Sequence, residues 1–371
     1  MELFADFDVS LTTRYLPESL REETKRAKLT GFDDKARDEY IRKAVVGNND
    51  EAVEEIKQRL YENSILADLC QVPLIFVMFS HMAHDQRDIM KFISVTQFFK
   101  HTIRCFYDHL KRKRKLYDDR NNMFYLHEME HHELDKIAFE GLNKENQQLS
   151  WIKTEFRQRV GLASYDQYII TGILVEEDVV GDDSTGDNVL FTTEVRFYHK
   201  LFCEWYAAHH LVTLVKNAYY LSDMLRFLDP FDLQYLFRFA CGLDPDAGKK
   251  LIIHLKSLPG GDAFAILCIL EQTGDVNEIM DSVKDLCSRD VKIQEGDSAL
   301  LQRSTTQLLE IASKNNIPIS CLHLDYSSIK FEGDTIILHS GIPLPKLPTV
   351  GKIHIAANNA PTGNPKFIDR K

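Results

Sequence analysis

The residues with the clearest chemical potential form the segment "HEMEH" at positions 127–131. On a helix, His127 and His131 would lie one turn apart on the same side, and neutral imidazoles at this spacing can both bind Zn²⁺. Glu128 would then deprotonate a metal-bound water. The segment therefore raises the hypothesis of a zinc hydrolase, which the surrounding elements have to support.

The surrounding sequence argues against a catalytic metal. A helical wheel drawn back from the apolar residues of segment 134–142 puts both histidines on the apolar side and turns Glu128 away. A zinc hydrolase also needs a third ligand, and neither H-x-x-G-x-x-H nor a convincing helical glutamate follows. We therefore expect His127 and His131 to be partly buried core residues beside carboxylates, and we expect no bound metal.

The composition is that of a globular chain with an acidic excess. The 371 residues are 44% hydrophobic and 27% charged, enough apolar material for two or three domains. A net charge of −11 excludes a whole-chain binder of nucleic acid or anionic membranes, because such surfaces are basic. The start "MELFADFDVS" lacks signal-peptide features, and the longest apolar run is too short to cross a bilayer. We expect a soluble, cytoplasmic protein with seven reduced cysteines.

Helices dominate the expected secondary structure of the first third of the chain. Residues 7–12 have the pattern of the end of a strand. Helices then follow from Asp33, an expected N-cap, and build a small helical domain up to about residue 112. The basic run "KRKRK" at 111–115 is typical of a nuclear-localisation patch or, in the interpretation that we favour, of a solvated linker.

The middle of the chain has the element order of a winged helix. Helical segments are expected at "HEMEH", near "WIKTEFRQRV" and at "SYDQYIITGI", and two β-rich runs then flank a turn rich in Gly, Asp, Ser and Asn. In "LFCEWYAAHHLVTLV", apolar residues have the spacing of a helix packed on one side, among them Leu201, Trp205 and Val215. Further helices fill residues 220–315. From Cys321 onward, short L-x-L runs indicate the first units of a leucine-rich array.

Several segments occur in an order that is characteristic of one family. They are "LTTR" followed by "LTGFDDKARDEYIRKAV", then "ENSILADLCQVPLIFVMF", "DQYIITGIL", "VRFYHKLFCEWYAAHHL" and "LQYLFRFACGLDPDAGKKLIIHL", from about residue 9 to 255. With this order the chain resembles the second half of the NACHT module of NOD-like receptors. The resemblance is nearest to the caspase-recruiting branch that forms inflammasomes.

The resemblance implies a mainly α fold with five parts. Residues 1–31 would be the C-terminal end of the α/β nucleotide-binding domain, and residues 32–115 a first helical domain. A winged-helix domain would follow at 116–203 and a second helical domain at 204–320. Residues 321–371 would be the start of leucine-rich repeats and a tail.

The resemblance also implies nucleotide-binding roles for three residues. Pro73 matches the proline that packs on the adenine, and a rigid ring without an N–H suits an apolar face. His199 matches the winged-helix histidine that contacts the β-phosphate of ADP in the inactive state, where an imidazole donor is suitable. Arg14 matches the arginine that senses nucleotide phosphate. Outside this context, each residue type at such a position usually has only a structural role.

Departures from the family limit these roles. Cys203 and Tyr15 stand where the family usually has glutamine and proline. The sequence also contains no G-x-x-x-x-G-K-[ST] and no apolar strand that ends in paired acids. We therefore expect no enzymatic activity and weak or absent binding of the ADP or ATP that the complete parent protein would bind.

The resemblance implies the regulatory and oligomerisation segment of an innate-immune receptor that ADP holds closed and that assembles on activation. Its partners would be copies of the same or a related receptor, with other proteins bound through the helical domains and repeats. Neither nucleic-acid binding nor membrane insertion is expected. The alternatives are a truncated, non-catalytic helical adaptor of full-length receptors and a zinc hydrolase that uses His127 and His131. Nucleotide binding separates the receptor segment from the adaptor, and metal retention identifies the zinc hydrolase.

Overall fold

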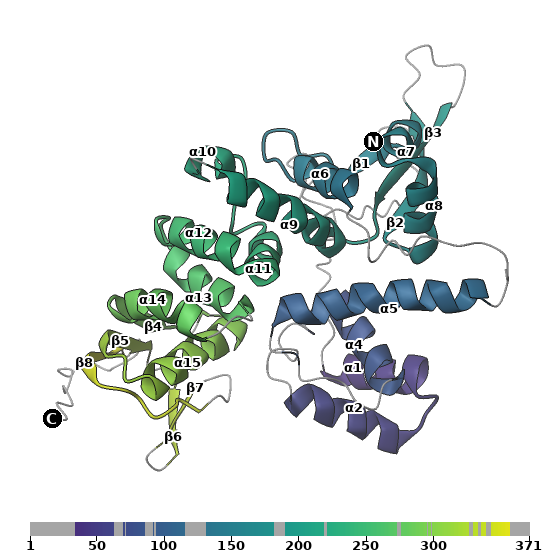
Figure 1. The fold of residues 1–371 in the computed structure, drawn as a ribbon. Coiled ribbons are helices and arrows are strands. Elements are labelled where there is room, and N and C mark those ends of the chain that lie inside the picture. Colours follow the sequence, from purple (N-terminus) through teal and green to yellow (C-terminus); the bar gives the residue numbers. More distant parts are fainter. Residues whose placement is uncertain are drawn as a thin grey trace, which may run out of the picture.

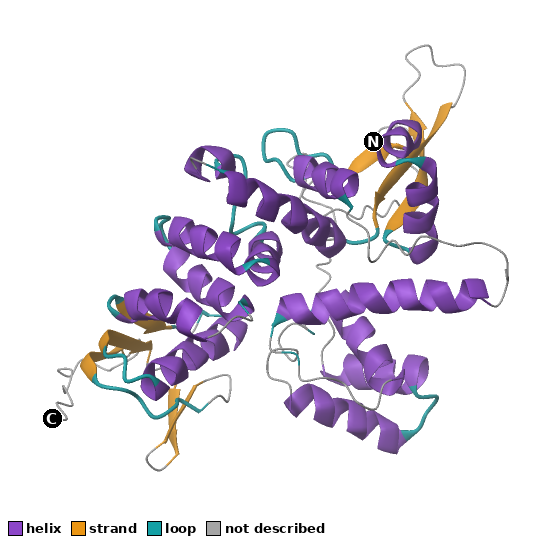
Figure 2. Cartoon of the chain, in the orientation of Figure 1, coloured by secondary structure: helices purple, strands orange, loops and turns teal. Residues whose placement is uncertain are grey.

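The computed structural model describes most of the chain, and the described parts are predominantly helical with three small sheets (Figures 1 and 2). The expected mainly α class is confirmed at this level. Arg14, His127, Glu128 and the first predicted strand lie outside the described residues. The described residues are 34–62, 70, 72–85, 92, 94–115, 131–181, 190–218, 221–272, 276–294, 296–297, 299–325, 329–332, 335–338 and 343–356.

The described part of the chain begins with a first bundle of helices, which is followed by α5 (Val95–Lys115). The bundle consists of α1 (Asp34–Tyr40), the π-helical turn η2 (Ile41–Val45), α2 (Asp50–Glu62) and α4 (Pro73–Asp85). The predicted linker at 111–115 is instead the end of α5, because the helical period continues through the basic run. Neither α5 nor any other helix in the described part of the chain is long and apolar enough to cross a membrane.

The next unit combines three helices with an antiparallel sheet. Its elements are α6 (His132–Gly141), β1 (Ser150–Ile152), α7 (Lys153–Val160), α8 (Leu162–Thr171), β2 (Leu174–Gly181) and β3 (Leu190–Phe197). The strand order is β1-β3-β2, and β2 and β3 form the predicted hairpin. The segment near "WIKTEFRQRV" is helical only from Lys153, since Trp151 pairs with Val195 across the sheet.

Helix α9 (Lys200–Asn217) is more deeply buried than its sequence predicts. Every residue from Leu201 to Ala208 is buried, although the apolar spacing predicted packing on one side. The reason is that α9 packs against α6 and β3 and also against α11 (Gln234–Leu243) and α12 (Pro245–Lys256). The one-sided prediction was therefore wrong for the first two turns of α9.

The remaining helices form a second helical region. Besides α11 and α12 it contains α10 (Leu221–Leu225), α13 (Gly261–Glu271), α14 (Val276–Cys287) and α15 (Ala299–Lys314). Asp244 caps α12 by accepting from the backbone N of Ala247, with Pro245 at the favoured first position. The turn into α13 requires glycine, because Gly260 has a φ of +73°.

The last region contains a parallel sheet in the order β4-β5-β8. Its strands are β4 (Asp290–Ile293), β5 (Ile319–Asp325) and β8 (Val350–Ala356), with α15 connecting β4 to β5. A separate hairpin of β6 (Ile329–Glu332) and β7 (Thr335–Leu338) lies between β5 and β8 in the sequence. The parallel sheet thus begins at β4, inside the range expected for the second helical domain.

Candidate functional site

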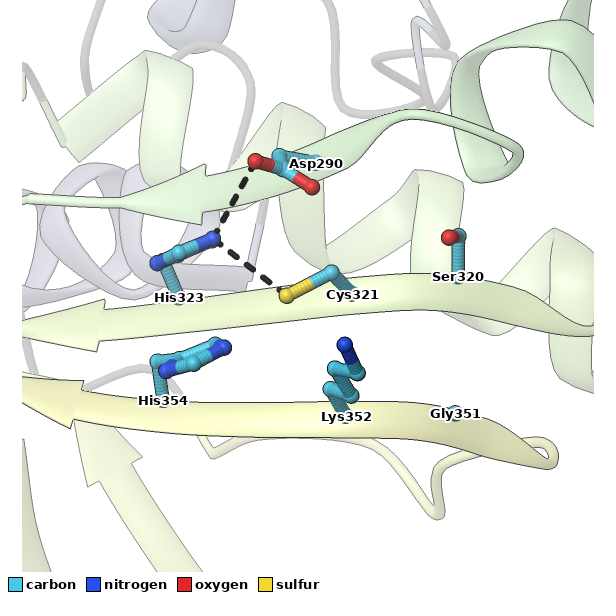
Figure 3. A pocket seen from close by; sticks show the side chains of 7 residues that line it. All are labelled: Asp290, Ser320, Cys321, His323, Gly351, Lys352 and His354. Carbon is cyan, nitrogen blue, oxygen red and sulfur yellow. Dashed lines mark hydrogen bonds and ion pairs between the residues drawn. The ribbon is translucent and has the colours of Figure 1, made fainter.

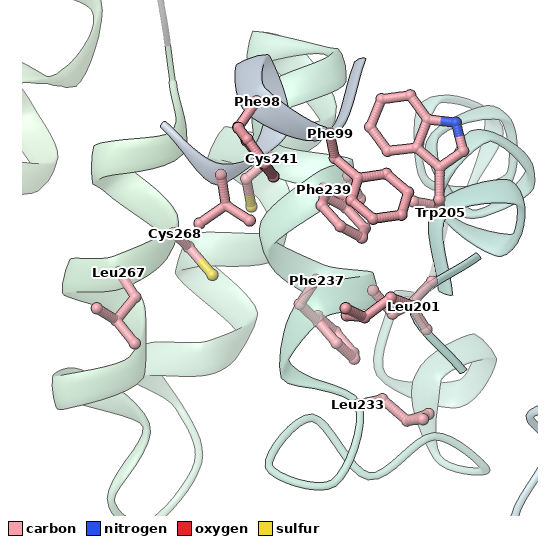
Figure 4. Close-up of a cluster of buried hydrophobic side chains, with 14 of the residues drawn as sticks. Phe98, Phe99, Leu201, Trp205, Leu233, Phe237, Phe239, Cys241, Leu267 and Cys268 are labelled. Atoms are coloured by element: carbon pink, nitrogen blue, oxygen red, sulfur yellow. The ribbon is translucent and has the colours of Figure 1, made fainter. Parts of the chain in front are cut away.

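The candidate site is built around helix α5, which lies between the first bundle and the rest of the molecule (Figure 1). Phe99 of α5 packs against Trp205 of α9 and Phe239 of α11, with ring centroids 5.4 and 5.0 Å away (Figure 4). The three helices therefore share an apolar core. One polar cluster lies at the first turn of α5, and a second lies about three turns further along it.

A buried ion pair holds the first turn of α5. Arg238 Nε and Nη2 donate to Glu271 Oε1 at 2.9 and 2.6 Å, and both side chains are only 2–3% exposed. Glu271 Oε2 accepts from the backbone N and the Oγ1 of Thr96, each at 2.9 Å. Such a carboxylate has the partners that buried charge requires. We call Thr96, Arg238 and Glu271 the α5 lock, because they join α5 to α11 and α13.

Three tyrosines from α5, α8 and α9 surround His131. His131 Nδ1 lies 2.8 Å from the Tyr168 hydroxyl, and the imidazole stacks on Tyr107 and meets Tyr206 edge-on. The Tyr107 and Tyr206 hydroxyls are 3.2 Å apart. Burial raises the pKa of all three phenols, so they stay protonated. We call Tyr107, His131, Tyr168 and Tyr206 the tyrosine cluster.

Asp135 of α6 lies beside the tyrosine cluster and is only 7% exposed. Its Oδ1 has no hydrogen-bond partner among the described residues. Burial raises the pKa of this carboxyl to about 8, so it is mainly protonated at neutral pH. Its ionisation would place an uncompensated charge against buried phenols, which makes the contact of α5 at Tyr107 sensitive to pH.

His199 caps the N-terminus of α9 directly after β3. Its Nδ1 accepts from the backbone N of Leu201 at 3.1 Å, and the side chain is half-buried. In a neutral imidazole that accepts through Nδ1, the proton is on Nε2, so Nε2 is the donor. A helix N-terminus also favours anions. The geometry is therefore compatible with the predicted phosphate contact, which itself stays a prediction.

Of the other two residues predicted to bind nucleotide, only Pro73 lies among the described residues. Pro73 is the exposed first residue of α4, a favoured position for proline. Helix α4 packs on α2 and η2, and it lies on the other side of α5 from α9 in Figure 1. Arg14 lies outside the described residues. The nucleotide pocket as a whole therefore stays a prediction.

The metal site predicted from "HEMEH" is not tested, because His127 and Glu128 lie outside the described residues. The described helix α6 starts at His132, and His131 stands at its N-cap. His131 lies against the aromatic side chains of the tyrosine cluster, and the expected position of both histidines on one helical face beside carboxylates stays a prediction. Its Nδ1 is already engaged by the Tyr168 hydroxyl, which leaves that nitrogen occupied.

A different group has the geometry of a metal site. Cys321 and His323 of β5 and His354 of β8 each offer one donor atom, and the three atoms lie within 4.8 Å of one another (Figure 3). His323 Nε2 is 3.3 Å from Cys321 Sγ and 3.3 Å from Asp290 Oδ2 of β4. Within the described residues, no other group of three such donors is this close.

Sequence reasoning missed the α5 lock, the tyrosine cluster and the group of donors at Cys321, His323 and His354. Thr96 and Glu271 are 175 positions apart, so no local spacing connects them. The signal for the metal-like group is only Cys-x-His at 321–323, with a histidine 31 positions after His323. No model of a known protein family matches the chain, and no curated protein matches it either.

Proposed function

We propose that this chain is the regulatory and oligomerisation portion of an intracellular, nucleotide-switched receptor of the NOD-like kind, with a closed state held by ADP. The observation that carries the proposal is the order of elements before His199. These elements are a helix, a strand, two helices and two strands, in a sheet ordered β1-β3-β2, and this order supports the proposed winged-helix domain. His199 then caps α9 at the position where the resemblance expects a phosphate contact.

The elements after α9 also favour this proposal. Helices α10 to α14 lead into parallel strands whose register places Asp290 opposite Cys321 and Cys321 opposite Lys352, each 31 positions after the last. Neighbouring parallel strands with buried leucines such as Leu322 and Leu324 favour leucine-rich repeats, although the interval of 31 positions is longer than the roughly 20–29 residues usual for them. A concave array of this kind would bind a partner or fold back as an inhibitor.

The two polar clusters along α5 provide a physical basis for a two-state switch. The α5 lock would keep α5 attached to α11 and α13, whereas the tyrosine cluster would be the contact that changes when the winged-helix unit rotates. In the closed state, His199 Nε2 would donate to a phosphate of ADP. A ligand shifts such an equilibrium only through contacts that differ between the states, and the His199 contact would be one of them.

The test is nucleotide retention by the product of the native transcript, purified from cells. We would measure nucleotide released on denaturation, and the size of the particles by sedimentation velocity. His199→Asp keeps a good N-cap acceptor for α9 but turns a negative charge toward the phosphate. We expect this variant to retain at least tenfold less ADP than the unmodified protein and to form larger assemblies, because the closed state is no longer favoured.

The matched control is His84→Asp, the same change at an exposed position of α4. It should retain ADP and sediment as the unmodified protein does. Equal ADP retention and equal sedimentation in His199→Asp and the unmodified protein would refute the assignment. A native product that binds related receptors without any nucleotide would instead support the helical adaptor.

A further inference from the structure

The parallel sheet gathers chemically soft donors on one face. Cys321 and His323 are two positions apart on β5, so their side chains point to the same side of the sheet (Figure 3). The register places His354 of β8 directly beside His323. Leu322 and Leu324, which alternate with these residues, are buried on the opposite side. The burial of the leucines therefore fixes which face of the sheet carries the thiol and the imidazoles.

The distances on this face approach those of a shared metal ion. In tetrahedral zinc sites, bonds of about 2.3 Å to sulfur and about 2.0 Å to nitrogen put these two ligand atoms roughly 3.6 Å apart. His323 Nε2 and Cys321 Sγ are already 3.3 Å apart. The rings of His323 and His354 are nearly parallel, at 10°, with centroids 4.7 Å apart. His354 is exposed, so its ring is free to rotate toward an ion without disturbing the core.

We infer that Cys321, His323 and His354 bind Zn²⁺, with the Asp290 carboxylate as the fourth ligand. A thiolate with two imidazoles suits zinc, whereas calcium and magnesium require mainly oxygen ligands. Asp290 Oδ2 lies 3.3 Å from His323 Nε2, and both side chains are partly exposed, so a small rotation brings the carboxylate to the ion. The ion would tie β4, β5 and β8 together. This site differs from "HEMEH" and is independent of the proposed nucleotide switch.

The positive charge of Lys352 lies beside the proposed site, so its effect on zinc binding can be tested by substitution. It lies opposite Cys321 in the register, and its ammonium points to the same face (Figure 3). A positive charge opposes the approach of a cation, although the flexible side chain is exposed and able to turn into solvent. Lys352→Met removes this charge and keeps most of the aliphatic stem. We expect it to tighten zinc binding several-fold, and we expect Asp290→Asn to weaken binding by more than the roughly tenfold that loss of an outer-shell partner costs.

The experiment is a titration of the full chain, stripped with a chelator under reducing conditions, with Zn²⁺ and separately with Co²⁺. We expect one equivalent of zinc to bind and Co²⁺ to give the charge-transfer absorption of a thiolate ligand with the visible bands of a tetrahedral ion. Cys321→Ser should abolish the charge-transfer band. His354→Ala should weaken zinc binding at least about 100-fold, more than loss of an outer-shell partner.

Two control variants decide where any bound zinc lies. Cys105→Ser removes a thiol whose Sγ is 3.4 Å from His101 Nε2, a similar pair that belongs to no described group of three donors. It should leave zinc binding unchanged. His131→Ala tests "HEMEH" and should also leave it unchanged. The proposal is overturned if the unmodified chain binds no zinc, if His354→Ala binds it equally well, or if His131→Ala abolishes binding.

Discussion

The two polar clusters along α5 differ in how their buried charge is balanced. In the α5 lock, Glu271 accepts hydrogen bonds from the Arg238 guanidinium and from the backbone N and hydroxyl of Thr96. Arg238 Nη1 alone in this group lacks a hydrogen-bond partner among the described residues. In the second region, Asp135 is buried beside the tyrosine cluster with one oxygen unbonded in the described structure. The first arrangement surrounds its carboxylate with donors, whereas burial in the second favours the neutral form of the Asp135 carboxyl.

The balance of buried charge determines which of the two contacts is better suited to open. Breaking a buried ion pair leaves a bare charge in the apolar interior, so the α5 lock resists opening. Opening the tyrosine cluster would let the Asp135 carboxyl reach water. Its opening therefore costs less free energy, because it removes the penalty of a buried polar atom without a hydrogen bond. The proposed rigid-body switch would therefore be fixed at the first turn of α5 and would open at the tyrosine cluster.

The largest effect should come from breaking the α5 lock. Arg238→Met keeps the apolar stem but leaves Glu271 without its cation, and we expect the unfolding free energy of the surrounding helices to fall by about 3–5 kcal/mol. Denaturant titration with hydrogen exchange of α5, α11 and α13 measures it. The control is Arg196→Met, which breaks the exposed pair with Glu177 and should cost less than about 1 kcal/mol. Equal losses in the two variants would contradict the lock.

An intermediate effect that depends on pH should follow from Asp135→Asn. The unfolded carboxyl ionises near 3.8, but the pKa in the folded state is about 8, so the folded state loses stability progressively as pH rises between these values. Asparagine cannot ionise and removes this loss. The variant should match the unmodified protein at acidic pH and exceed its unfolding free energy by about 2 kcal/mol above pH 8, after allowance for water entry.

The control for this pH dependence is Asp281→Asn, at a carboxylate whose side chain is 98% exposed. Thermal unfolding across pH should give nearly parallel curves for this variant and the unmodified protein. The curve for Asp135→Asn should diverge from both as pH rises. A constant difference at every pH would show that Asp135 does not titrate as its burial requires.

The sequence predicted the local elements of this fold better than its contacts. The hairpin of β2 and β3 and the helix from Lys200 were predicted, because alternation and helical period are local properties. The depth of burial of α9 was not, since it depends on α6 and α11 packing from two sides. The strand β4 was missed because four residues with two buried side chains carry little periodic signal.

The polar sites were less predictable still. His131 was singled out for a pattern with His127, yet its described contacts come from Tyr107 of α5, Tyr168 of α8 and Tyr206 of α9, which no sequence spacing connects. The same holds for Arg238 and Glu271, whose pairing depends on how α11 meets α13. Local sequence determines elements, whereas side chains from distant elements meet only through tertiary packing.

The smallest effect should come from the hydrogen bond within the tyrosine cluster. His131→Phe keeps an aromatic ring but leaves the Tyr168 hydroxyl without its 2.8 Å partner, which should cost about 1 kcal/mol. Tyr168→Phe should cost a similar amount, because it removes the other partner of the same bond. When both groups are removed, no buried polar atom of this pair stays unbonded, so the double variant should be nearly as stable as either single one. Additive losses in this cycle would show that the bond does not hold α6 against α8, and the tyrosine cluster would then be a packing contact only.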